Sequence, residues 1–357
     1  MKKFKATAVS PANIAFIKYW GWKNEQDKKL ILPASDSISM NLNNCLTTTT
    51  VEFSPLFKKD SVYISFFGEK PFDTLRHAQG RTRQKLLLRQ DGVVGGSREK
   101  VMRQVNRLRA MANIDIPVKI VSQNSFPANA GIASSASAFS ALTLVVSQAL
   151  GLNWDQKKLS IETRLSGSGS ACRSTIDGFA CWQRGENSED SYAYQLEDES
   201  WWDLVDIVAV VSTDAKKVSS REGHELATTS PHYASRLVEL PQKIAQVKEA
   251  ILNKNFTLLG ETIEQEAMSM HKICATSDPP IYYLNSETHE IMQALQQWRK
   301  AGLFGYFTMD AGPNVHVICK RKDAQEINNK LMKLQNVLFT IINKPCKGTR
   351  LINEHLF

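Results

Sequence analysis

Short runs of apolar and β-branched residues in the first 70 positions predict a series of β-strands. The run over 47–53 is the densest in β-branched side chains, which pack well on a pleated surface. The run over 204–212 is apolar almost without a break and predicts a strand that is buried on both faces. The other strands are expected at 4–9, 14–18, 38–42 and 61–67, and as a strand–turn–strand unit within 306–319.

Apolar residues at helical spacing predict helices between and after these strands. The helix over 136–151 is expected to stop at Gly151, because glycine favours the backbone conformation that ends helices. A long helical pattern over 233–270 is expected to be interrupted near Pro241, since proline cannot donate the backbone hydrogen bond of a helix interior. Further helices are expected at 100–111, 155–165, 286–300 and 323–334.

Strands and helices in both halves of the chain predict an α+β fold with two domains. We place the boundary near residue 195, where the acidic stretch 197–199 precedes Trp201 and Trp202. The predicted domains are therefore 1–195 and 196–357. The two tryptophans are expected to pack at the interface between the domains.

The composition narrows the class of protein. A chain of 357 residues with 42% hydrophobic residues can fill a sizeable core. It has no run of 18 apolar residues, and residues 1–10 lack the apolar stretch of a signal peptide, so a membrane span and secretion are not expected. The six cysteines include no Cys-x-x-Cys pair, which argues against a zinc site and a disulfide framework. A cytoplasmic location fits best.

The net charge of +8 comes from one segment. Ten basic and two acidic residues between 76 and 109 account for the whole excess. A basic patch can bind nucleic acid, but this one lacks interleaved aromatic residues. A solvated insertion followed by one basic helix face is the favoured interpretation, and nucleic-acid binding is the alternative.

The most informative segment is the small-residue loop 127–137, which lies between a β-like run at 116–121 and the predicted helix over 136–151. A helix N-terminus has unpaired backbone N–H groups and a positive dipole end, and both favour a phosphate. The hydroxyls of Ser134, Ser135 and Ser137 can contact phosphate oxygens or a bound Mg²⁺. No Gly-Lys-Ser/Thr follows, so this is not a Walker loop. A plain helix N-cap is the alternative.

Three further turns combine glycine or small residues with charge, at 13–21, 166–174 and 308–314. Together with the serine loop they supply the cations Lys18 and Arg173, several hydroxyls and the carboxylate Asp310. Each residue also has a simpler explanation. Lys18 can be an edge-strand lysine and Asp310 an ordinary turn residue. Ser168 can be a helix cap and Arg221 a surface arginine.

Five segments of this chain are informative when they are taken together and in order. They are ANIAFIKYWG (12–21), FPANAGIASSASAF (126–139), RLSGSGSACRS (164–174), KKVSSREG (216–223) and TMDAGPNVHV (308–317). These collinear segments resemble the GHMP kinase superfamily and, within it, the mevalonate diphosphate decarboxylases. The resemblance implies an N-terminal domain of the ribosomal-protein-S5-domain-2 type, a ferredoxin-like C-terminal domain and a homodimer. It implies that ATP, with Mg²⁺, phosphorylates the 3-hydroxyl of 5-diphosphomevalonate. Loss of phosphate and CO₂ then yields isopentenyl diphosphate for isoprenoid biosynthesis.

The resemblance also implies roles for individual residues. Asp310 matches the carboxylate that orients or deprotonates the tertiary hydroxyl, a task worth about 10² to 10⁴-fold in rate. Arg173 matches a planar partner for the substrate carboxylate, and Lys18 a cation close to the reacting centre. The matching ATP-binding residues are Gly131, Ala133, Ser134 and Ser135, and no protein ligand to a metal is expected. The matching substrate-binding residues are Asn13, Tyr19, Lys23, Ser168, Ser220 and Arg221.

The chain departs from the family pattern at three places. Trp22 stands where a lysine usually follows Tyr-Trp-Gly and contacts the 5-diphosphate. Residues 34–39 and Asp177 also differ from the common pattern. The first two departures resemble phosphomevalonate decarboxylases, which act on a monophosphate. An alternative substrate is therefore 5-phosphomevalonate, with isopentenyl phosphate as the product. A GHMP kinase that does not decarboxylate is a further alternative.

Overall fold

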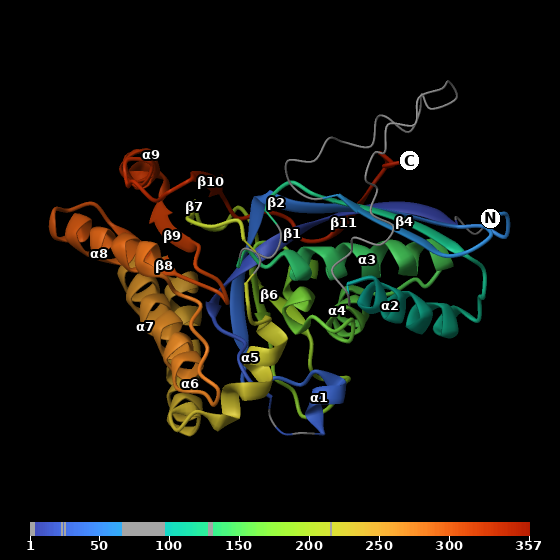
Figure 1. The fold of residues 1–357 in the computed structure, drawn as a ribbon, viewed down its shortest axis with the longest axis horizontal. Helices are drawn as coiled ribbons and strands as arrows, with labels where there is room; N and C mark the ends of the chain where they lie inside the picture. Colours follow the sequence, from blue (N-terminus) through green and yellow to red (C-terminus); the bar gives the residue numbers. More distant parts are fainter. Residues whose placement is uncertain (1–3, 23, 25, 66–96, 128–130, 215) are drawn as a thin grey trace.

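The computed structural model describes residues 4–22, 24, 26–65, 97–127, 131–214 and 216–357. Two β-sheets organise these residues (Figure 1). Three parts of the chain discussed above lie outside the described residues. They are residues 76–96 of the basic segment, Lys23, and residues 128–130 of the small-residue loop. The fold is mixed α+β, as expected from the sequence.

The first sheet has seven strands, in the order β11-β1-β2-β4-β3, with β5 paired to β2 and β6 paired to β5. The expected strands at 4–9 and 14–18 are one continuous strand, and those at 38–42 and 47–53 are another, because the two long strands pair antiparallel through a register shift at Pro11. The strands are β1 (Lys5–Ile17), β2 (Ser37–Phe53), β3 (Ser61–Ser65), β4 (Val118–Asn124), β5 (Phe179–Trp182), β6 (Ala193–Glu197) and β11 (Arg350–Ile352).

Helices cover one face of this sheet (Figure 1). Helix α3 packs against β1 and β2, and α2 packs against α3. The left-handed backbone of Gly151, with φ of 73°, ends α3 and confirms the predicted stop. The helices of this half are α1 (Asp27–Leu30), α2 (Ser97–Ala112), α3 (Ser134–Leu150), α4 (Gln156–Arg164) and the 3-10 helix η2 (Gly169–Thr175).

The second sheet has four strands in the order β10-β7-β9-β8. The predicted strand at 204–212 is β7, and every residue of it is buried, as expected. The strands are β7 (Leu204–Val210), β8 (Gly305–Thr308), β9 (Val315–Lys320) and β10 (Phe339–Asn343). The helices of this half are α5 (Ser220–Leu226), the 3-10 helix η3 (Ala227–Thr229), α6 (Tyr233–Leu252), α7 (Phe256–Ala275), α8 (Ser286–Lys300) and α9 (Arg321–Leu331).

The predicted interruption near Pro241 is wrong. Helix α6 runs through Pro241, and the chain instead breaks at Asn253, Lys254 and Asn255. Lys254 has a φ of 52°, and the Asn255 side chain caps the start of α7. The buried residues of α6, among them Leu240 and Val247, pack into the core on both sides of the proline, and this tertiary packing keeps the helix continuous.

One apolar core continues from the first sheet into the second. It joins Ile14 and Ile38 of the first sheet to Val208 and to Leu259 of α7, and Trp202 belongs to it. The strand β11 returns from the C-terminal half and pairs with β1. The division at residues 195 and 196 stays a prediction. None of the helices in the described part of the chain is long and apolar enough to span a lipid bilayer.

Candidate active site

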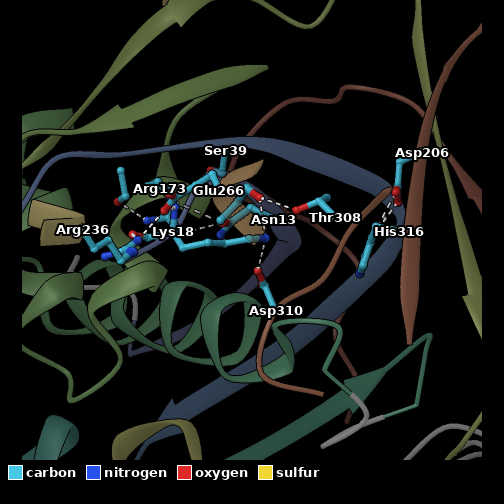
Figure 2. Close-up of polar contacts among 12 residues, drawn as sticks. Asn13, Lys18, Ser39, Arg173, Asp206, Arg236, Glu266, Thr308, Asp310 and His316 are labelled. Carbon is cyan, nitrogen blue, oxygen red and sulfur yellow. Dashed lines mark hydrogen bonds and ion pairs between the residues drawn. The ribbon is translucent and has the colours of Figure 1, made fainter. Parts of the chain in front are cut away.

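An ion pair between Lys18 and Asp310 lies where the two sheets meet. Lys18 follows the last residue of β1, and Asp310 lies in the turn between β8 and β9. The Lys18 ammonium Nζ lies 2.8 Å from Asp310 Oδ1 and also donates to the carbonyl of Ala15 at 2.7 Å (Figure 2). The Lys18 side chain is 1% exposed and that of Asp310 is 24% exposed, so the carboxylate is the member of the pair that a ligand can reach.

Burial and charge shift the ionisation of both groups. Burial lowers the pKa of Lys18 below its ordinary value, against the opposing pull of Asp310. Burial alone would raise the pKa of Asp310, but the charge and hydrogen bond of Lys18 bring that pKa below its ordinary value. Asp310 is therefore an ionised carboxylate at neutral pH, ready to accept a proton or a hydrogen bond.

Arg173 is a buried cation that neutral groups hold in place. It lies in η2 and its residue surface is 2% exposed. Its Nε donates to Ser39 Oγ at 3.0 Å, its Nη2 to Asn13 Oδ1 at 3.2 Å, and its Nη1 to Ser37 Oγ. Among the described residues, no carboxylate forms an ion pair with it. A desolvated guanidinium without a charged partner is suited to bind an anionic ligand.

Asn13 orients this arginine. Besides accepting from Arg173, its side-chain amide donates to Ser174 Oγ at 2.8 Å and to the carbonyl of Ser170 at 3.3 Å. Figure 2 shows Asn13 and Ser39 beside the guanidinium, with Lys18 nearby. The structure thus places Asn13 behind Arg173, and Asn13 is not among the residues that line the cavity.

A cavity of about 820 Å³ brings most of the predicted site residues together. It extends from the Lys18–Asp310 pair towards the N-terminus of α3 on one side and towards α5 on another. Apolar residues of the first sheet and of α3, including Ile120 and Leu142, line one part of it. The predicted residues that line it are Lys18, Tyr19, Gly131, Ala133, Ser134, Ser135, Ser168, Arg173, Ser220, Arg221 and Asp310.

The small-residue loop meets the Asp310 turn directly. Gly131 has a φ of 81°, and a Cβ on it would lie 2.9 Å from the Cα of Gly312. Only glycine fits this contact and this backbone conformation. The loop and the turn therefore approach each other closely, which brings the start of α3 next to Asp310.

The start of α3 is not a side-chain N-cap. The N-cap residue is Ala133, with a φ of 46° and no side-chain cap hydrogen bond, so the plain-cap alternative is wrong. Ala133, Ser134 and Ser135 at the start of α3 line the cavity, and a helix N-terminus is a place where backbone N–H groups lack intrahelical partners. Ser137 does not join them, because it is fully buried and bonded to Thr47 Oγ1 at 2.6 Å.

An aromatic wall closes the cavity on the side of β1. The ring of Tyr19 lies 5.7 Å from that of Trp22 and 4.1 Å from that of His224. His224 accepts the N–H of Gly21 at 2.9 Å, and burial lowers its pKa to about 3, so its ring is neutral. The Tyr19 hydroxyl and the Trp22 indole nitrogen are buried without a hydrogen-bond partner in the described structure.

Two cavity residues were missed from the sequence. Lys216 donates to the carbonyl of Ala311 at 3.0 Å, and burial lowers its pKa while Asp310 opposes the shift. It belongs to the segment 216–223, but a lone lysine in that segment gave no signal of its own. His224 was not predicted as a site residue, because its position beside Tyr19 and Gly21 depends on the fold.

Helix α5 presents Ser220 and Arg221 to the cavity. Ser219 caps α5 through a capping box with Glu222, which leaves Ser220 and Arg221 on the first turn. Arg221 is half-exposed and lies 3.5 Å from Glu225. A surface pair of this kind holds an arginine only weakly, so Arg221 can exchange this partner for a phosphate.

The start of α3 contributes Ala133, Ser134 and Ser135 to the cavity lining. A helix N-terminus favours the phosphates of a nucleotide. No group of three acidic, histidine or cysteine side chains is close enough together to hold a metal in the described residues. Hard divalent cations such as Mg²⁺ are often held by phosphate oxygens and few protein groups.

Two family models match the chain. The diphosphomevalonate decarboxylase-like N-terminal domain matches residues 10–193, and the mevalonate 5-diphosphate decarboxylase C-terminal domain matches residues 206–350. The diphosphomevalonate decarboxylase of Candida albicans is 32% identical over 345 residues, which are 92% of this chain and 88% of that protein.

Solved structures agree with these matches. The mevalonate diphosphate decarboxylase from Staphylococcus aureus has a TM-score of 0.85 and 36% identity, with 98% of each chain covered. A structure of MDDEF in complex with MVAPP, AMPPCP (an ATP analogue) and magnesium has a TM-score of 0.82 and 32% identity. It covers 98% of this chain and 99% of that one.

Proposed function

This chain belongs to the diphosphomevalonate decarboxylase family, and we propose that it catalyses the ATP-dependent decarboxylation of (R)-5-diphosphomevalonate. The products are isopentenyl diphosphate, ADP, phosphate and CO₂. The observation that carries the proposal is the Lys18–Asp310 pair beside the buried, uncompensated guanidinium of Arg173. The phosphoryl transfer requires a carboxylate, and the decarboxylation requires a guanidinium that binds the substrate carboxylate.

Asp310 serves the phosphoryl transfer. Its ionised carboxylate accepts the proton of the tertiary 3-hydroxyl as the hydroxyl oxygen attacks the terminal phosphorus of ATP, and ADP leaves. Lys18 keeps Asp310 ionised, since its charge lowers the pKa of the carboxyl. Lys18 also places a positive charge where the new 3-phosphate forms.

Arg173 serves the decarboxylation. Its fork holds the substrate carboxylate in a fixed plane, which a lysine could not do. The bond between the carboxyl carbon and C2 then breaks, and its electron pair forms the C2–C3 double bond. The 3-phosphate leaves with the electrons of its C–O bond, and the nearby cation Lys18 stabilises the departing anion.

The start of α3 binds the phosphates of ATP. Ala133, Ser134 and Ser135 line the cavity at this helix N-terminus, which favours a phosphate, and Gly131 permits the close approach of the loop to the Asp310 turn. Lys216, which donates to the carbonyl of Ala311, adds a cation to the cavity lining. Ser134 and Ser135 would help to hold Mg²⁺ together with the phosphates of ATP, and the ion would neutralise phosphate charge there.

The 5-phosphates of the substrate bind between η2 and α5. Four of the predicted substrate-binding residues line the cavity: Tyr19, Ser168, Ser220 and Arg221. Asn13 acts from behind by orienting Arg173. Lys23 is proposed to replace the missing lysine contact at Trp22, and it lies outside the described residues. The monophosphate remains the second candidate substrate, because Trp22 removes a charged contact.

The assembly and location are also proposals. We place the protein in the cytoplasm as a homodimer. All six cysteines are free and five of them are buried, which fits a reducing compartment. The homodimer follows from the family resemblance.

Product stoichiometry tests the function. Purified protein with Mg-ATP and 5-diphosphomevalonate should release ADP and inorganic phosphate in equal amounts, together with CO₂. ADP without free phosphate would identify a kinase that does not decarboxylate. Parallel assays with 5-phosphomevalonate decide between the two substrates, and a steep dependence of oligonucleotide binding on salt would be needed to revive the nucleic-acid alternative.

A further inference from the structure

A second ion pair lies directly behind Lys18. Arg236 of α6 and Glu266 of α7 contact each other through Arg236 Nη2 and Glu266 Oε1, and their side chains are 1% and 0% exposed. Lys243 lies on the far side, with its Nζ 3.8 Å from Glu266 Oε2. Neither residue of the Arg236–Glu266 pair lines the cavity.

This pair holds both main-chain polar groups of Lys18. Glu266 Oε1 accepts the backbone N–H of Lys18 at 3.2 Å, and Arg236 Nη2 donates to the backbone carbonyl of Lys18 at 3.2 Å (Figure 2). Lys18 comes just after the last residue of β1, so the strand ladder does not supply these partners. Buried main-chain groups need partners, and here two side chains of the other half of the molecule provide them.

We propose that Arg236 and Glu266 are positioning residues that fix Lys18 against Asp310. The proposal rests on the role of Lys18 in the proposed function. The main chain of Lys18 is held from behind by this pair, and its ammonium is held in front by Ala15 and Asp310. The lysine is thereby fixed at both ends.

The energetics of a buried ion pair favour this interpretation over a purely stabilising one. Taking two charges out of water costs about as much as their attraction returns, and a well-packed apolar pair is often as stable. Position is a different matter, since a displacement of about 1 Å in an active site can cost about 10²-fold in rate. An apolar pair could not form the hydrogen bonds that Arg236 and Glu266 make to the main chain of Lys18.

The effect of the Arg236–Glu266 pair on Lys18 can be measured from the pH dependence of kcat, because charges around Lys18 shift its pKa. Asp310 and Glu266 favour the ammonium form of Lys18, and Arg173 opposes it. His271 of α7 also faces this region, and burial lowers its pKa to about 3, so it stays neutral. Removal of the Glu266 carboxylate should therefore lower the pKa of Lys18, and activity should be lost at a lower pH on the alkaline side.

The test uses the double variant Arg236→Met/Glu266→Met in the full chain. It removes both charges together, so no unpaired buried charge remains to unfold the protein. We expect kcat to fall by about 10²-fold, with the KM for ATP nearly unchanged. The variant should still fold with a cooperative thermal transition, at a temperature lowered by the two main-chain groups of Lys18 that lose their partners. The alkaline limb of the kcat profile should move to lower pH.

Two further variants make the result specific. Arg236→Met/Glu266→Gln keeps an amide oxygen for the Lys18 N–H and should recover part of the lost kcat. Arg299→Met/Glu264→Met removes a second ion pair of α7, which contacts the backbone of Gly305 and Phe307 but not Lys18. This control should retain kcat within a few-fold.

The outcomes separate this inference from the proposed function. Wild-type protein that releases no phosphate or CO₂ would overturn the function itself. Active wild-type protein together with a folded Arg236→Met/Glu266→Met variant of normal kcat and unchanged pH profile would overturn the positioning role alone. An equal loss of kcat in the Arg299→Met/Glu264→Met control would also overturn it, because any buried pair of α7 would then have the same effect.

Discussion

Lys18 Nζ and Asp310 Oδ1 lie 2.8 Å apart, although 292 positions separate the two residues in the sequence. Lys18 comes from the end of a strand in the seven-stranded sheet, and Asp310 from a turn in the four-stranded sheet. The pair exists only when the two sheets pack together. The candidate active site is therefore a property of the whole molecule and of neither half alone.

Asp310→Asn should lower kcat by at least about 10²-fold, because the amide keeps the shape of the side chain but cannot accept a proton. The KM for ATP should change little. Steady-state kinetics with saturating 5-diphosphomevalonate provides the measurement. Asp115→Asn, at an exposed carboxylate, is the matched control. Near-normal turnover in a folded Asp310→Asn protein would reduce Asp310 to a turn residue.

Arg173→Lys should be nearly as damaging as Arg173→Ala. The three neutral partners of Arg173 are arranged around a planar guanidinium, and a point charge cannot replace a bidentate fork. The comparison needs kcat for both variants and a thermal transition to show that both fold. If lysine restores most of the activity, Arg173 supplies charge and not geometry.

The alkaline limb of the kcat profile should belong to Lys18. Burial lowers the pKa of Lys18, so its ammonium form is lost as pH rises through a value below the ordinary 10.5. Asp310 has a lowered pKa and stays ionised throughout the neutral range. Activity should therefore fall on the alkaline side as Lys18 loses its proton.

Lys18→Arg provides the check, because a guanidinium does not lose its proton in this range. The variant should show lower kcat but no alkaline limb below about pH 10.4, the ordinary pKa of a lysine. Profiles of wild type and variant that superimpose after scaling would assign the limb to another group.

Trp22→Lys should raise kcat/KM for the diphosphate only modestly. A lysine–phosphate contact is worth roughly 1.5–3 kcal/mol, or about ten- to a hundredfold in affinity. The gain is offset because the substitution removes the ring that packs against Tyr19. Assays of both substrates, with Trp22→Phe as the control that keeps an aromatic ring, measure the effect.

The substrate preference of the wild-type enzyme decides how the Trp22→Lys result is interpreted. We expect it to prefer the diphosphate. A preference for 5-phosphomevalonate of about tenfold or more, the loss of one charged contact, would make the monophosphate the substrate. The decarboxylase assignment would stand in either case.

Local sequence determined much of what the fold uses. The apolar run at β7, the glycine stop after α3 and the small residues before α3 each depend on neighbouring positions only, and the structure confirms all three. The segments that carry the site were also recognisable in the sequence. The predicted roles of their residues remain predictions.

Tertiary structure decided the rest, because packing between distant segments outweighs local preference. The proline in α6 did not end the helix, since apolar residues on both sides of it are buried in one core. Ser137 was grouped with its neighbouring serines by spacing, yet the sheet behind α3 takes its hydroxyl away from the cavity. The contact of Gly131 with Gly312 and the support of Lys18 by Arg236 and Glu266 join residues far apart in the chain. No local pattern encodes such contacts, because they form only when the two sheets are brought together by their shared core.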